Sequence, residues 1–248
     1  MKTIRFSEAC GPEGLRLYAI GDIHGRLDLL KAMHGRIADD LAARRPADFR
    51  IVYIGDYTDR GPDSKGVLDF LSASCKQDSR NIALMGNHDE EFLEFLATAK
   101  RDGLFACNGG DATARSYGVE IDFSSGRHAR AGRDRLLKAM PETHIVFLSS
   151  LRRSVTLGDF FFCHAGIRPG VPLDAQDPHD LIWIRQGFLD HAGLYEKVIV
   201  HGHTPVARPD IQPNRIDIDT GAFKTGRLTA LVIDGGEKTL IEVSDNQW

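Results

Sequence analysis

Five short apolar runs in this 248-residue chain each end in a cluster of glycine and metal-ligating polar residues. Three of the runs, Leu15–Ile20, Arg50–Ile54 and Asn81–Met85, have strand character and lie in the first third. Between them, apolar residues at helical spacing predict helices near residues 27–41 and 67–71. The βαβαβ order predicts an α/β fold with parallel strands, which bind ligands at their carboxyl ends.

The remainder of the chain divides into a mainly helical segment at about residues 90–151 and a strand-rich last third. Within the helical segment, Glu90–Lys100 is predicted as a helix, and Asn108–Asp111 as a turn into a capped helix. The strands predicted in the last third are Ser154–Leu157, Phe160–Cys163, Lys197–Val200, Arg215–Ile218, Leu228–Ile233 and Thr239–Val243. We found no repeats or linkers, so we expect one domain over residues 1–248.

Composition limits the classes of partner. A net charge of -4 and a pI near 6.2 give no basic surface for nucleic acid or an acidic membrane, so neither is expected as a partner. The four cysteines are scattered without a Cys-x-x-Cys pair, and the first residues lack the apolar stretch of a signal peptide. We therefore expect a cytoplasmic protein. The oligomeric state is left open.

The five polar clusters are rich in ligands for divalent cations. They are Gly21–Gly25 (GDIHG), Gly55–Gly61 (GDYTDRG), Gly86–Asp89 (GNHD), His164–Gly166 (HAG) and His201–Pro205 (HGHTP). Carboxylate, imidazole and amide oxygen together suit ions such as Mn²⁺ or Fe²⁺, whereas a structural zinc site would favour thiolates. Any single cluster is a weak signal, because Gly-Asp is an ordinary turn. Five clusters, each after a predicted strand, indicate a metal site.

In order and context, these clusters resemble the calcineurin-like metallophosphoesterase superfamily, and within it the phosphoprotein phosphatase branch with its bacterial and phage serine/threonine phosphatases. The resemblance covers nearly the whole chain. It implies a four-layer α/β/β/α sandwich of two mixed sheets, with the site formed by loops at one edge of the sheets.

Carried over by position, the resemblance implies a centre of two divalent metal ions with six ligands. Asp22 and His24 would bind the first ion, Asp56 would bridge both ions, and the second ion would be completed by Asn87, His164 and His203. Two cations about 3.5–4 Å apart can activate water for direct attack on a phosphorus atom. We expect Mn²⁺ first, with Fe, Zn or Mg as alternatives, because availability decides among them.

The resemblance also implies the residues that act on the substrate. His88 would protonate the leaving alkoxide, while Asp59 would fix the tautomer of His88 and raise its pKa. Arg60 and Arg185 would bind the phosphate with their guanidinium forks, and Asn87 is assigned to the substrate as well as to metal.

Two departures from related patterns bear on the substrate. Pro205 stands where many phosphodiesterases of the superfamily have a second metal-binding histidine, which leaves that ligand position to water. Asp89 stands where eukaryotic protein phosphatases usually have Glu, which points to a bacterial-type enzyme. We therefore expect hydrolysis of phosphomonoesters, with phosphoserine or phosphothreonine in proteins as the leading substrate.

Two alternatives remain open. Relatives that split dinucleoside polyphosphates such as diadenosine tetraphosphate symmetrically share all five clusters. Such a substrate needs cations and an adenine-stacking surface, and the segment 90–151 offers Arg101, Arg115 and Arg127 without an obvious aromatic platform. The other alternative is an inactive metal-binding regulatory module, against which the intact His88–Asp59 pair argues.

Three features near the clusters receive no catalytic assignment. His201 would share a strand face with His203, and a structural role is favoured. Cys163 has no partner cysteine nearby in sequence, so a buried inert thiol is expected. The turn Asp219–Gly221 resembles a family loop near the site, but a polar turn between strands explains it nearly as well.

Overall fold

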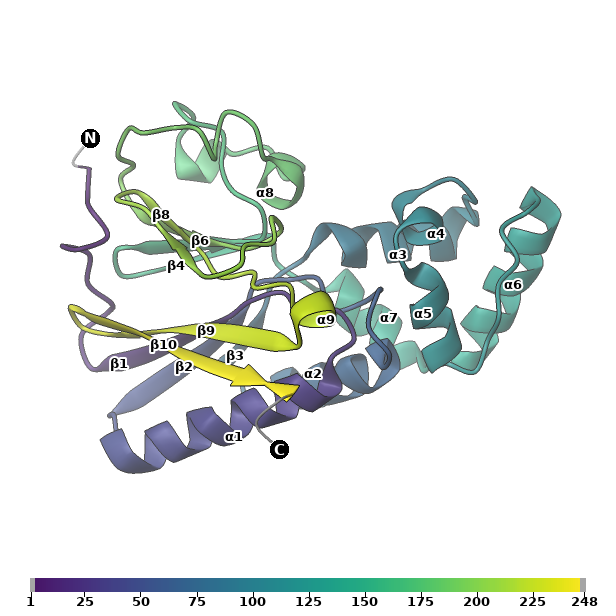
Figure 1. Cartoon of the computed structure of the whole chain (residues 1–248), viewed down its shortest axis with the longest axis horizontal. Coiled ribbons are helices and arrows are strands. Elements are labelled where there is room, and N and C mark those ends of the chain that lie inside the picture. The colour runs from purple at the N-terminus through teal and green to yellow at the C-terminus, as the bar shows by residue number, and fades with distance from the viewer. Residues whose placement is uncertain (1–2, 246–248) are drawn as a thin grey trace.

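The computed structural model describes residues 3–245, in which two five-stranded sheets lie against each other with helices around them (Figure 1). The ends of the predicted domain, residues 1–2 and 246–248, lie outside the described residues. The strand order is β10-β9-β1-β2-β3 in the first sheet and β4-β5-β6-β8-β7 in the second. Each sheet contains parallel and antiparallel pairs, so the predicted fold of two mixed sheets is confirmed.

The strand bounds agree closely with the predicted runs. The first sheet consists of β1 (Leu15–Ile20), β2 (Asp48–Tyr53), β3 (Asn81–Ala83), β9 (Arg227–Asp234) and β10 (Glu237–Ser244). The second sheet consists of β4 (Ser154–Leu157), β5 (Phe160–Cys163), β6 (Val198–His201), β7 (Asp210–Ile211) and β8 (Arg215–Asp217). The two-residue strand β7 was not predicted, because so short a pairing leaves no periodic signal in the sequence.

Alternation along the strands builds a core on each side of the first sheet. In β1, Tyr18 and Ile20 pack toward the helices, whereas Leu17 and Ala19 pack into the space between the sheets. The second sheet sends Phe160 and other β5 and β6 residues into the same space. Because side chains of a strand point to opposite faces in turn, runs that are apolar throughout are buried on both faces.

Helices α1 (Leu27–Arg44) and α2 (Ser64–Gln77) lie along the outer face of the first sheet (Figure 1). The predicted helical segment lies to one end of the sandwich and contains α3 (Asn87–Thr98), α4 (Leu104–Cys107), α5 (Gly110–Ser116), α6 (Gly126–Ala139) and α7 (Glu142–Ser149). The outer face of the second sheet is covered by loops, a 3₁₀ turn at Leu173–Ala175 and the short helix α8 (Asp180–Trp183). A further short helix, α9 (Ala222–Thr225), precedes β9.

Helix α3 begins three residues before its predicted start. The Asp89 side chain accepts a hydrogen bond from the Gly86 backbone N–H at 3.1 Å, which caps the helix so that Asn87 and His88 form its first turn. The cluster GNHD is therefore a helix start that presents two polar side chains to the end of the sandwich. Among the described residues, the helices are too short or too polar to cross a membrane.

Candidate metal centre

The residues predicted to bind metal follow five parallel strands drawn from both sheets. Asp22, Asp56 and Asn87 come after β1, β2 and β3, and His164 and His203 come after β5 and β6. All five side chains are buried, as is His24. The carboxyl ends of parallel strands meet at one edge of each sheet, which explains why residues far apart in sequence gather here.

The loops that carry these residues have an unusual backbone. Among the described residues, the following non-glycine residues of the predicted site have a positive φ between 45° and 70°: His24, Asp56, Asp59, Arg60 and His203. Such conformations cost roughly 1–3 kcal/mol each and concentrate at functional sites. Gly86 allows the close approach, because a Cβ atom there would collide with the Asp56 carboxylate.

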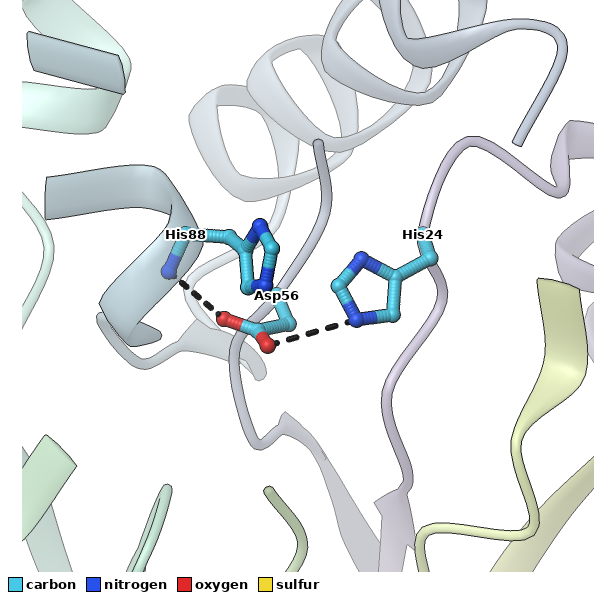
Figure 2. Close-up of side chains that lie close together, drawn as sticks. All are labelled: His24, Asp56 and His88. Atoms are coloured by element: carbon cyan, nitrogen blue, oxygen red, sulfur yellow. Dashed lines mark hydrogen bonds and ion pairs between the residues drawn. The ribbon is translucent and has the colours of Figure 1, made fainter. Parts of the chain in front are cut away.

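Asp56 lies at the middle of the cluster. Its Oδ2 is 3.3 Å from His24 Nε2, and its Oδ1 is 3.4 Å from His164 Nε2. Figure 2 shows the His24 and His88 rings beside this carboxylate, whose Oδ1 also accepts the backbone N–H of His88 at 3.0 Å. Burial raises the pKa of Asp56, but His164 and His88 outweigh it, so the pKa lies well below its ordinary value and the group is a carboxylate.

The hydrogen bonds of two histidines decide which ring nitrogen faces Asp56. His24 Nδ1 donates to the Thr58 carbonyl at 2.7 Å, and His164 Nδ1 donates to the Ile54 carbonyl at 3.0 Å. In the neutral ring, Nε2 then carries a lone pair. Both lone pairs point toward carboxylate oxygens of Asp56, an arrangement of acceptors that a cation satisfies.

A second set of acceptors faces Asn87. Its Oδ1 is 3.0 Å from His164 Nε2 and 2.9 Å from His203 Nδ1, while His203 Nε2 is buried without a hydrogen-bond partner among the described residues. Asp56, His164 and His203 form one group with metal-binding distances, and His24, Asp56 and His88 form another. Because Asp56 belongs to both groups, the donor set fits two cations with a shared carboxylate.

Asp22 lies beside these groups but belongs to neither. Its Oδ2 accepts the backbone N–H of His203 at 3.1 Å. Burial, followed by the charges of Asp219 and Asp56, raises the pKa of Asp22 well above its ordinary value. A bound cation relieves this repulsion among buried carboxylates, so Asp22 fits the centre by charge.

His88 and Asp59 form the pair that the sequence predicts. His88 Nδ1 is 2.7 Å from Asp59 Oδ2, and both side chains are buried. The predicted effect on His88 is wrong, because burial lowers the pKa of the ring to about 4. Burial likewise raises the pKa of Asp59 to about 8, so neither buried group favours its charged form.

The two predicted phosphate-binding arginines occupy different surroundings. Arg60 Nη1 donates to His24 Nε2 at 3.0 Å, and Nη2 donates to His88 Nε2 at 2.8 Å. Arg185 is exposed, and its Nη2 donates to the His203 carbonyl at 3.2 Å. Arg60 therefore lies inside the cluster, whereas Arg185 lies at its rim.

The structure adds three side chains that the sequence did not identify. Thr113 of α5 donates to Asp59 Oδ1 at 2.8 Å. The Phe223 ring lies under the Arg60 guanidinium with 4.8 Å between Cζ and the ring centroid, and the Trp183 ring is 6.3 Å from the His203 ring. No spacing in the sequence signals these contacts, because each joins segments that are distant along the chain.

The unassigned features also have clear positions. Strand β6 ends at His201, so the argument that placed His201 and His203 on one strand face does not apply, and the buried His201 ring packs edge-on to Phe188. The Cys163 thiol is buried and donates to the Gly166 carbonyl at 3.4 Å, and burial raises its pKa. Asp219 is buried near Asp22, so the turn Asp219–Gly221 contributes charge to the centre.

Comparisons with known proteins find similar sequences and similar structures. The sequence model of a family described as calcineurin-like phosphoesterase matches residues 15–225. Relatives from Anoxybacillus flavithermus and Bacillus velezensis, both named bis(5'-nucleosyl)-tetraphosphatase PrpE, asymmetrical, are 26% and 27% identical to the chain. These alignments cover 86% and 91% of this chain, and 88% and 92% of the relatives.

Solved structures show the same fold. A crystal structure assigned provisionally as a diadenosine tetraphosphatase aligns with a TM-score of 0.64 at 20% identity, over 96% of this chain and 99% of that one. The cold-active protein-tyrosine phosphatase of a Shewanella species aligns with a TM-score of 0.52 at 18% identity, over 91% of this chain and 81% of that one. At such identities the likeness extends to the fold alone.

Proposed function

Because the chain belongs to the calcineurin-like phosphoesterase family, and is therefore a hydrolase of phosphate esters, we propose that it splits dinucleoside tetraphosphates asymmetrically at a centre of two divalent cations. The observation that carries the proposal is the set of acceptors that converge on Asp56 from both sheets. The family assignment argues against the inactive regulatory module.

In this proposal, Asp22 and His24 would hold the first cation, Asn87, His164 and His203 would hold the second, and Asp56 would serve both, since it belongs to both groups of ligands. When bound, the cations supply a nucleophilic water and offset the charge of the phosphoryl oxygens. We keep His88 as the proton donor that the family resemblance implies, paired with Asp59 at 2.7 Å, although it also lies within metal-binding distance of His24 and Asp56.

The proposed reaction breaks one P–O bond. The oxygen of water forms a new bond to phosphorus and the water releases a proton, while the leaving oxygen takes a proton from His88 as its own bond to phosphorus breaks. In the ligand-free geometry Arg60 Nη2 donates a hydrogen bond to His88 Nε2. This ring nitrogen is therefore the acceptor and carries no proton. Binding of a phosphate would draw the Arg60 guanidinium to the phosphoryl oxygens and free His88 Nε2 to take up the proton that it transfers.

The substrate ranking differs from the one reached from the sequence. Relatives aligned over most of the chain carry the name of an asymmetrical dinucleoside tetraphosphatase, which supports a nucleotide substrate over a phosphoprotein and asymmetrical over symmetrical cleavage. The phosphoprotein remains the second candidate. Its support is the exposed guanidinium of Arg185, which a phosphate carried on a large substrate can reach at the rim of the centre.

A parallel assay of the purified protein loaded with Mn²⁺ tests the proposal. Diadenosine tetraphosphate should yield ATP and AMP, since asymmetrical cleavage leaves three phosphates on one nucleoside. Release of ADP alone would support the symmetrical alternative. Faster turnover of phosphoserine or phosphothreonine peptides than of diadenosine tetraphosphate would make phosphoproteins the leading substrate, as expected from the sequence.

A further inference from the structure

Each arginine expected to bind phosphate has an aromatic side chain beside it. The Phe223 ring lies under the Arg60 guanidinium, and Trp183 precedes Arg185 by two residues on the exit from α8. Both rings are only partly buried, so each keeps some surface accessible to a ligand. Neither ring belongs to the helical segment 90–151, in which the sequence offers no obvious aromatic platform.

The two rings pack against different groups of candidate ligands. Phe223 packs edge-on to His24 of one group, with 5.3 Å between ring centroids. Trp183 packs edge-on to His203 of the other group at 6.3 Å. Asp56 belongs to both groups, because its two oxygens face His24 and His164, and the His164 ring is 5.0 Å from that of His203.

Contacts with the rest of the fold fix the position of both rings. Helix α8 is tied to the His164 loop by the hydrogen bond from Ala165 N–H to the Leu181 carbonyl at 2.8 Å. Within α8, the His179 and Trp183 rings stack with an interplanar angle of 14°. Helix α9 is tied to the start of α1, because Arg26 Nη1 donates to the Ala222 carbonyl at 2.9 Å. Figure 1 shows α9 at the end of the β9–β10 layer.

We propose that Phe223 and Trp183 are nucleobase platforms, one beside each group of candidate ligands, that hold the two bases of a dinucleoside polyphosphate. The inference rests on the proposed function and names the residues that give it specificity. A phosphate chain bound at Asp56, which belongs to both groups, would have one ring beside each group. Stacking of a base on an aromatic side chain contributes about 1–3 kcal/mol, which is about a 5-fold to 100-fold gain in affinity.

The test compares AMP with ribose 5-phosphate, which carries the same phosphate but no base. Calorimetry with the Mn²⁺-loaded protein should show that AMP binds about 5-fold to 100-fold more tightly. Trp183→Leu and Phe223→Leu should each reduce this ratio. The measured quantity is the ratio of the affinity for AMP to the affinity for ribose 5-phosphate. A substitution that weakens phosphate binding by moving Arg60 lowers both affinities alike and leaves this ratio unchanged. If Trp183→Leu does not fold, Phe223→Leu still provides a test, because Phe223 is only partly buried.

Phe49→Leu is the matched control. It removes a stack of the same kind, with the Arg80 Cζ 4.2 Å from the Phe49 ring, near the start of β2 and thus at the end of the strand opposite Asp56. This variant should keep the AMP advantage. Equal affinity of the wild type for AMP and ribose 5-phosphate would overturn the proposal, and an unchanged ratio in either variant would overturn the role of that ring.

Two further outcomes separate this inference from the proposed function. If diadenosine tetraphosphate is not cleaved but AMP binds more tightly than ribose 5-phosphate, the proposed substrate is wrong and the nucleobase platforms are supported. If diadenosine tetraphosphate is cleaved but AMP binds no more tightly than ribose 5-phosphate, the proposed function is supported and the platforms are wrong. Phenyl phosphate distinguishes a base from a tyrosine ring, because an advantage as large as that of AMP would overturn the nucleobase assignment.

Discussion

Thr113 Oγ1 donates to Asp59 Oδ1 at 2.8 Å, while the other oxygen of the same carboxyl group lies 2.7 Å from His88 Nδ1. Thr113 belongs to α5 in the helical segment, whereas Asp59 follows β2. The same hydroxyl accepts the backbone N–H of Asp59 at 2.7 Å, so it fixes both the main chain and the side chain. Helix α5 is thus joined to the proposed proton donor, His88, through Asp59.

Thr113→Val should lower kcat by about tenfold, because a buried oxygen of Asp59 loses its donor and His88 loses a fixed partner, at a cost of roughly 1–3 kcal/mol. Thr113→Ser keeps the hydroxyl and should restore most of the activity. Steady-state kinetics and metal analysis of both variants provide the measurement. Equal loss of activity in the Ser and Val variants would show that the hydroxyl does not position Asp59.

His88→Asn should lower kcat by about 10²–10⁴-fold with little change in metal content, since the variant removes a proton donor and leaves the ligand set intact. The defect should be smaller for substrates whose leaving group is already a weak base, such as p-nitrophenyl phosphate. Metal loss in step with the loss of activity would instead make His88 a ligand of the ion near His24 and Asp56.

His203→Ala should remove bound metal and activity together, because His203 Nδ1 and Asn87 Oδ1 face each other at 2.9 Å as parts of one donor set. Arg185→Lys is the matched comparison, because Arg185 lies at the rim and donates to the His203 carbonyl. It should retain metal and raise KM, since a lysine keeps the charge but loses the guanidinium fork. Metal analysis after dialysis separates the variants, and full metal retention by His203→Ala would exclude His203 from the centre.

Much of the fold could be predicted because central strands such as β1 and β5 are almost entirely buried. Leu15–Ile20 is apolar apart from Arg16, and Phe160–Cys163 is apolar throughout. Both runs end at glycine or histidine clusters, so their bounds are visible in the sequence. The start of α3 was missed because its cap is formed by Asp89 from within the polar cluster, where no apolar period marks the boundary.

The site could be predicted only in part, because the sequence orders ligands along the chain but does not measure contacts between distant segments. The cluster GDYTDRG reveals Asp56, Asp59 and Arg60, yet nothing in it reports that Thr113 and Phe223 meet these side chains. The direction of the His88 pKa shift was missed for the same reason, since it depends on burial by the whole fold.

Stability at mildly acidic pH should depend on His34 of α1, which is not one of the residues of the proposed centre. Its ring packs against Tyr53 and Phe70, and its Nε2 is 2.8 Å from the Tyr53 hydroxyl. Burial lowers the pKa of His34 from 6.5 to about 4. In the unfolded chain His34 is protonated below about pH 6.5, whereas in the folded chain it is protonated only below about pH 4. Between these pH values the unfolded state binds more protons, so the free energy of unfolding decreases as the pH falls from 6.5 to 4.

His34→Phe should remove this loss while the Tyr53 hydroxyl keeps its hydrogen bond to Asn81 Oδ1. Lowering the pH from 7.5 to 5 should reduce the free energy of unfolding of the wild type by about 2 kcal/mol more than that of the variant. Urea denaturation of metal-free protein at both pH values measures the difference. His128→Asn, on the exposed side of α6, is the control and should behave as the wild type. An equal loss in the wild type and His34→Phe would show that other groups govern the acid sensitivity.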